Sequence, residues 1–156
     1  MISMKAVRLW FMPGKIVRAF DRAKRAVLQR GAEAVRDYAR ESMPRRRGVS
    51  SPGRPPRMRS SWLRRSVHRA WDRQSETAVA GPFRVKGTGA AEERNLMRVL
   101  EFGGDYTLGK KAMKRRHIRR DRKVTVKIPP KPYMGPALKR VSPSLPRMWA
   151  GSVRGG

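Results

Sequence analysis

The chain has 156 residues, no cysteine, and 39 Lys and Arg against 11 Asp and Glu, a formal net charge of +28 at pH 7. This length suits one domain, and the absence of cysteine excludes disulfides and thiolate metal sites. Such a charge indicates an acidic partner, either nucleic acid or an acidic protein surface, although a merely solvated basic surface would give the same composition.

The apolar content of 38% predicts a modest core, with some segments buried only against a partner. No apolar run approaches the roughly 18 residues that a transmembrane helix needs. The N-terminus also lacks a secretory signal pattern. We therefore expect no membrane partner and a cytoplasm-like compartment.

The N-terminal third of the chain contains the clearest helix signal. Residues 1–14 form an arm that ends at Pro13-Gly14, and from Lys15 to Ser42 apolar residues recur every three or four positions. This spacing predicts a long amphipathic helix that lies on a sheet or on a neighbouring subunit. Gly31 costs its middle up to about 1 kcal/mol relative to Ala, which favours a kink or a close helix contact there.

The middle of the chain is predicted to contain a loop and a β-hairpin. Residues 44–61 are rich in Pro, Gly, Ser and Arg without periodicity, which indicates a loop or docking arm. Trp62 and Leu63 open a strand-like stretch, and the alternating segments Ser66–Trp71 and Glu76–Ala80 flank a polar turn.

A second helix and a second strand pair follow. Ala90–Phe102 is predicted to be a helix that ends in a glycine cap at Gly103-Gly104. Asp105–Leu108 can then pair with Lys123–Ile128 across a strongly basic loop at residues 109–123.

The stretch Ile128–Leu138, IPPKPYMGPAL, combines the end of a strand, a rigid corner, an apolar plug and the start of a helix. Its prolines fix φ and keep the corner extended, whereas Pro136 suits the first turn of a helix over Met134–Val141. We expect Tyr133 and Met134 to be packing anchors that join this strand to this helix.

Together these elements predict one α+β domain over residues 15–142. Its long N-terminal amphipathic helix packs on a small, mainly antiparallel β-sheet, with a short C-terminal helix and extended basic loops at residues 44–61 and 109–123. Residues 143–156 form a C-terminal tail.

No catalytic constellation is evident. His68 and His117 have no acidic or thiol companions at ligand spacing, and the adjacent Glu92 and Glu93 point to different sides of a helix. We predict no catalytic residue, no metal site and no cofactor.

The basic loops are the candidates for contact with DNA or an acidic partner. Loop side chains contact phosphates readily but seldom read base edges, and plain solvated loops are the alternative. The runs lack aromatic residues, which argues against stacking on single strands. The candidates are Arg45, Arg46, Arg47, Arg54, Arg57, Lys110, Lys111, Lys114, Arg115, Arg116, Arg119 and Arg120.

Apolar side chains on the predicted elements are candidates for packing within a subunit or between subunits. They are Phe20, Val27, Tyr38, Trp62, Leu100, Phe102, Tyr133, Met134, Leu138 and Trp149.

Four blocks together resemble the HK97 gp10-like family of bacteriophage head–tail joining, neck and tail-completion proteins. They are the long helix ending in ARESMP, then SSPGRPPRMRSSWLRRSV, then LEFGG, and finally IPPKPYMGPALKRVSPSLPRMWAGS. Their order and spacing over residues 15–152 carry the resemblance more than any single block does.

The resemblance implies a small α+β subunit of a ring, usually a hexamer, at the head–tail junction of a long-tailed phage. Its partners would be neighbouring neck and head-closure proteins, the tail tube protein and the phage DNA in the channel. The protein would assemble in the host cytoplasm and end in the virion, and the family has no catalytic residues to carry over.

The rival hypothesis is a free basic nucleic-acid-binding protein, such as a ribosomal or nucleoid-like component. The apolar block Tyr133–Trp149 separates the two hypotheses, because a simple polyanion binder does not need it.

Overall fold

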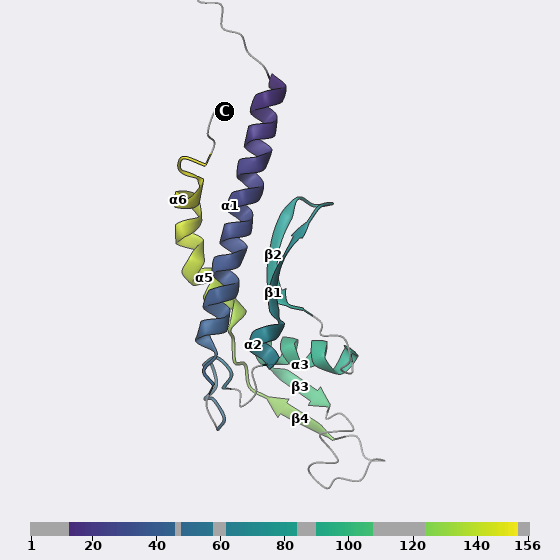
Figure 1. The fold of residues 1–156 in the computed structure, drawn as a ribbon. Helices are drawn as coiled ribbons and strands as arrows, with labels where there is room; N and C mark the ends of the chain where they lie inside the picture. Colours follow the sequence, from purple (N-terminus) through teal and green to yellow (C-terminus); the bar gives the residue numbers. More distant parts are fainter. Residues whose placement is uncertain (1–12, 46–47, 58–61, 84–89, 108–123, 153–156) are drawn as a thin grey trace, which may run out of the picture.

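The computed structural model describes residues 13–45, 48–57, 62–83, 90–107 and 124–152 of the 156-residue chain (Figure 1). The elements in chain order are α1 (Pro13–Ser42), α2 (Trp62–Ser66), β1 (Val67–Asp72), β2 (Thr77–Pro82), α3 (Ala90–Phe102), β3 (Gly104–Thr107), β4 (Thr125–Ile128), α5 (Met134–Val141), the 3₁₀ turn η1 (Ser142–Ser144) and α6 (Leu145–Trp149).

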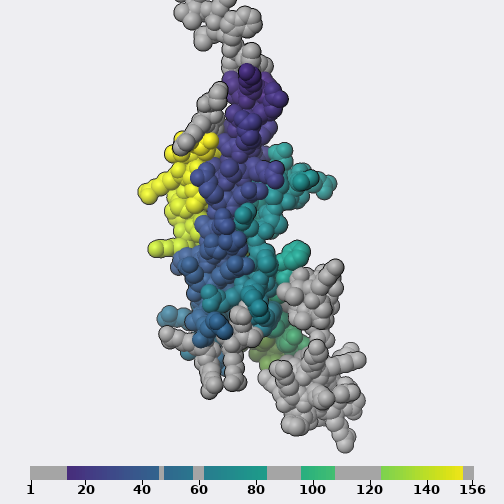
Figure 2. Space-filling view, in the orientation of Figure 1, coloured from purple at the N-terminus to yellow at the C-terminus, as the bar shows by residue number. Residues whose placement is uncertain are grey.

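The predicted α+β class is confirmed, with α1 as its central element. α1 contacts the β1–β2 hairpin on one side and α5 and α6 on the other, so that α1 is the middle one of three layers (Figure 1). The N-terminal end of α1 extends beyond both of these layers, and Figure 2 shows the resulting elongated body with α5 and α6 in yellow at its side.

The described strands form two separate antiparallel pairs instead of the one small sheet that we expected. In the first pair Val67 lies opposite Pro82, and in the second Gly104 lies opposite Ile128. The two pairings are those that the sequence predicted. They do not join because α3 and its glycine turn carry β3 past the lower end of the hairpin (Figure 1).

The prediction that Trp62 and Leu63 open a strand is wrong, because both lie in the one-turn helix α2. Leu63, Ser66 and Val67 are all fully buried, and their spacing of three and four residues is that of one helical face. The Ser66 hydroxyl also donates a hydrogen bond to the Leu63 carbonyl oxygen at 2.7 Å, so the strand begins only at Val67.

The core lies at the C-terminal half of α1, where α2, α3 and α5 meet it. Its buried members are Val35, Ala39, Met43, Leu63, Val67, Met97, Leu100, Tyr133, Ala137 and Val141. This core joins residues from both ends of the described chain.

The segment assigned to the C-terminal tail continues from α5 as η1 and α6, which packs on α1. The Trp149 ring stacks on Phe20 with centroids 5.9 Å apart. A Cβ at Gly31 would lie 2.7 Å from Leu145 Cδ2, which confirms the close contact predicted at this glycine. A side chain at this position would force the end of the Leu145 side chain to move.

Candidate interaction surface

The proline corner between β4 and α5 is held by backbone hydrogen bonds on two sides. The amide of Lys131 donates to the Leu100 carbonyl oxygen at 2.7 Å, and the amide of Gly53 donates to the Pro130 carbonyl oxygen at 2.8 Å. The corner is thereby attached to α3 and to the loop at residues 48–57. This position delivers Tyr133 into the core, where it is 1% exposed.

Glu101 caps the N-terminus of α5. Its carboxylate accepts hydrogen bonds from the backbone amides of Tyr133 at 2.9 Å, Met134 at 3.1 Å and Gly135 at 2.7 Å. The first amides of a helix have no partner within the helix and carry its positive dipole end, so a carboxylate there is favourable. Sequence reasoning missed this contact, because nothing local links Glu101 to a segment 32 residues later.

The buried Tyr133 is one of the residues that line an apolar groove. Burial raises the pKa of its phenol far above the usual value, and the nearby Glu101 carboxylate adds to that rise. The neutral phenol is therefore the form that the folded protein holds.

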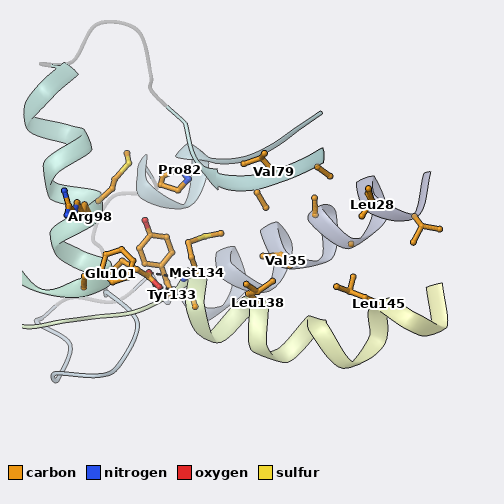
Figure 3. A pocket seen from close by; sticks show the side chains of 18 of the residues that line it. Leu28, Val35, Val79, Pro82, Arg98, Glu101, Tyr133, Met134, Leu138 and Leu145 are labelled. Atoms are coloured by element: carbon orange, nitrogen blue, oxygen red, sulfur yellow. Dashed lines mark hydrogen bonds between the residues drawn. The ribbon is translucent and has the colours of Figure 1, made fainter. Parts of the chain in front are cut away.

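An apolar groove of about 770 Å³ runs along α1 between the hairpin and the C-terminal helices (Figure 3). Val35 and Leu28 contribute to its α1 side, Val79 to its β2 side, and Leu138 and Leu145 to the wall formed by α5 and α6. Such concave, mainly apolar surfaces are the usual form of binding sites.

Large apolar side chains on this groove remain uncovered. Val79 is 53% exposed, Leu138 53% and Phe102 77%. At the end near Tyr133, Arg98 and Glu101 are the charged residues of the lining. Exposed apolar side chains gathered around one cavity are typical of an interaction surface, whereas isolated ones need no explanation.

The β1–β2 hairpin forms one wall of the groove, and the turn end of this hairpin is fixed to α1. The Lys24 ammonium lies 2.6 Å from the Glu76 carboxylate, and the Arg25 guanidinium lies 5.5 Å from the centre of the Trp71 ring. The Lys24 hydrogen bond holds the pKa of Glu76 below its usual value. These contacts keep β2 at the side of the groove.

The lower part of the hairpin is fixed to α1 by an arginine. Arg40 donates from Nε and Nη2 to the Val67 carbonyl oxygen at 3.0 and 2.7 Å. One turn earlier, Arg36 donates to Asp37, and this hydrogen bond lowers the pKa of that carboxyl below its usual value.

The basic candidates fall into two groups. Arg45, Arg54 and Arg57 are exposed, and the latter two belong to the loop whose Gly53 is bonded to the proline corner. The remaining nine lie outside the described residues, namely Arg46, Arg47, Lys110, Lys111, Lys114, Arg115, Arg116, Arg119 and Arg120.

The packing candidates divide between the core and the surface. Val27, Leu100 and Tyr133 are buried, and Trp62, Met134 and Trp149 are partly buried. The others are exposed, namely Phe20, Tyr38, Phe102 and Leu138. Of these four exposed residues, Phe102 and Leu138 line the groove.

Among the residues that the structure describes, no group of three or more His, Cys, Asp or Glu side chains could hold a metal ion. None of the helices in the described segments is long and apolar enough to cross a membrane.

Comparison of the chain with protein-family models, with curated proteins and with solved structures gives no match.

Proposed function

We propose that the protein is a structural subunit of the head–tail junction of a long-tailed bacteriophage, in the neck or tail-completion ring. It would join the tail tube to the head-closure proteins and surround the DNA channel as a homo-oligomeric ring, usually of six copies. It would act by assembly, not by catalysis, and would reside in the virion.

The observation that carries this proposal is the apolar groove with its uncovered rim. A chain of +28 charge exposes Val79, Phe102 and Leu138 around one cavity. This arrangement suits a subunit that buries apolar surface against protein neighbours. The order of the four sequence blocks that resemble neck proteins supports the same reading.

The basic loops fit a place beside DNA. Arg45, Arg54 and Arg57 are exposed, and the loop that contains Arg54 and Arg57 is bonded to the proline corner through Gly53. In the sequence, the basic residues 109–123 separate the paired strands β3 and β4. Phosphate contacts of this kind carry no base specificity, which suits DNA that passes through a channel.

The first experiment measures the size of the oligomer and its binding to tail tubes. Mass photometry of nuclease-treated protein in 1 M NaCl should give a ring-sized oligomer, and the protein should cosediment with tail tubes. A monomer that sediments only with nucleic acid would instead support the free nucleic-acid-binding protein, which the exposed arginines also suit.

A second experiment tests the DNA contact in the virion. Replacing Lys110, Lys111, Lys114, Arg115 and Arg116 with Ser should impair DNA retention or passage without preventing ring formation. Virions of this variant that assemble and infect normally would contradict a role of this loop at the DNA.

A further inference from the structure

The sequence of the N-terminal segment and the surface of the groove are both strongly apolar. Nine of the twelve residues 1–12 are apolar, including Trp10 and Phe11, although the whole chain is only 38% hydrophobic. The groove presents Val79 and Leu138, each 53% exposed, along α1. In so basic a chain, the apolar segment and the uncovered apolar groove are chemically complementary.

The length of the segment decides which copy it can reach. Val27 and Val35 follow Pro13 by 14 and 22 residues, so they lie about 21 and 33 Å along the helix. Trp10 precedes Pro13 by three residues, so the two are at most about 11 Å apart. The aromatic pair of one copy therefore stops short of Val27 and Val35 on the α1 side of its own groove.

Residues 1–12 precede, in sequence, the end of α1 that extends beyond the hairpin and α6 (Figure 1). Ile16 and Val17 on this end are about half exposed, at 49% and 57%. Phe20, where the contact with α6 begins, is 50% exposed although it stacks on Trp149. The apolar character of residues 1–12 thus continues onto a projecting helix end, which is suitably placed to enter a neighbouring molecule.

We infer that residues 1–12 of one copy occupy the α1–β2–α5 groove of the next copy, with Trp10 and Phe11 as anchors. Each copy has one such segment and one such groove, so this is a heterologous contact, and a closed ring satisfies every copy. The inference rests on the proposed function, since it names the contact that would join the subunits of the ring.

Photo-crosslinking in the full-length chain tests which copy is bound. Phe11→benzoylphenylalanine protein is mixed with ¹⁵N-labelled protein that lacks the photoreactive residue, in 1 M NaCl, and irradiated. We expect cross-links to peptides that contain Val79 or Leu138, in pairs of one unlabelled and one labelled peptide. If every cross-linked pair consists of two unlabelled peptides, or if the cross-links reach other surfaces only, the inference is overturned.

Substitutions on both sides of the contact provide the second test. Trp10→Ser with Phe11→Ser, and separately Leu138→Asp, should each raise the dissociation constant of the oligomer at least about 100-fold, because hot-spot side chains dominate interfaces. Leu138 is already half exposed, so the subunit should remain folded by circular dichroism. Val49→Asp is the matched control, since Val49 is 82% exposed and does not line the groove.

The outcomes separate this inference from the proposed function. If the wild-type protein forms rings, and the Trp10→Ser/Phe11→Ser and Leu138→Asp variants form them equally well, the segment contact is overturned. The ring proposal then remains intact. Wild-type protein that stays monomeric in 1 M NaCl and does not bind tail tubes contradicts the proposed function itself.

Discussion

The side chain of Glu101 connects two helices that are distant in sequence. It belongs to the last turn of α3, yet its carboxylate accepts three amide hydrogen bonds from residues 133–135. The same contacts orient Tyr133, the largest fully buried side chain. One carboxylate thus couples α3, the proline corner and α5.

Replacing Glu101 should lower the free energy of unfolding measurably. We expect Glu101→Ala to cost about 2 kcal/mol, because it leaves three amides at a helix N-terminus without their acceptor. Glu101→Gln keeps one acceptor oxygen and should cost less. Urea denaturation followed by circular dichroism measures both, with Glu41→Ala at an exposed α1 position as the control. Equal stability of the Glu101→Ala and control variants would contradict the capping role.

The buried phenol of Tyr133 predicts a loss of stability at alkaline pH. Its pKa is raised in the folded protein, whereas an unfolded tyrosine loses its proton near pH 10. Above about pH 10 the unfolded state therefore binds fewer protons than the folded state, and the free energy of unfolding falls as pH rises.

Tyr133→Phe removes this contribution while keeping the ring. Between about pH 9.5 and 11 the variant should lose roughly 1 kcal/mol less than the wild type. Denaturant unfolding at both pH values measures the difference, and Tyr38→Phe on the exposed side of α1 should follow the wild type. Parallel declines for Tyr133→Phe and wild type would show that Tyr133 does not carry the effect.

At the scale of elements, the turn between α3 and β3 requires glycine for two reasons. Gly103 has a φ of 77°, which disfavours a side chain. A Cβ there would also lie 3.0 Å from Pro130 Cδ and 3.1 Å from Pro130 N, both in a rigid ring. The turn and the proline corner thus pack directly against each other.

Gly103→Ala should consequently cost about 2–4 kcal/mol, from backbone strain and from the clash with Pro130. Gly53→Ala is the matched control, because Gly53 has a φ of 73° with no atom within 4 Å of a built Cβ. It should lose only about 1 kcal/mol. Thermal unfolding compares the two, and a similar loss for both would mean that the Pro130 contact yields easily.

Much of the architecture was predictable because its signals are local. The apolar spacing of α1, the polar turn of the hairpin, the glycine cap at Gly103 and Pro136 in the first turn of α5 each depend on neighbours in sequence. α2 was not predictable, because WLRRS fits a strand or a helical turn equally well until burial of Leu63 and Ser66 decides.

The groove depends on distant segments and could not be predicted. Its lining combines α1, β2, α3, α5 and α6, and its shape depends on how closely α6 approaches Gly31. Sequence reasoning named Tyr133, Met134, Leu138 and Trp149 as packing candidates, but it gave no means to separate buried from exposed members.

At the scale of the whole molecule, the charge of +28 opposes association between copies. Raising NaCl from 0.1 to 1 M shortens the Debye length from about 10 to 3 Å, so repulsion between subunits weakens while apolar burial persists. Binding to DNA must change in the opposite direction, since salt reduces the gain from counterion release.

We therefore expect opposite salt dependences in one protein. Mass photometry should show larger oligomers in 1 M than in 0.1 M NaCl, whereas the affinity for a labelled DNA duplex, measured by fluorescence anisotropy, should fall at least about 1,000-fold over the same range. Self-association that weakens with salt would indicate that charge pairs, not apolar contacts, join the copies.

The order in which the core segments are synthesised has a consequence for folding in the cell. The stripe of α1 is complete by residue 42, but its partners Tyr133, Ala137 and Val141 are translated about a hundred residues later. At 5–20 residues per second, α1 is made roughly 5–20 s before the helix that covers it. During this interval the nascent chain exposes its main apolar stripe, so the subunit can complete its fold only when α5 leaves the ribosome.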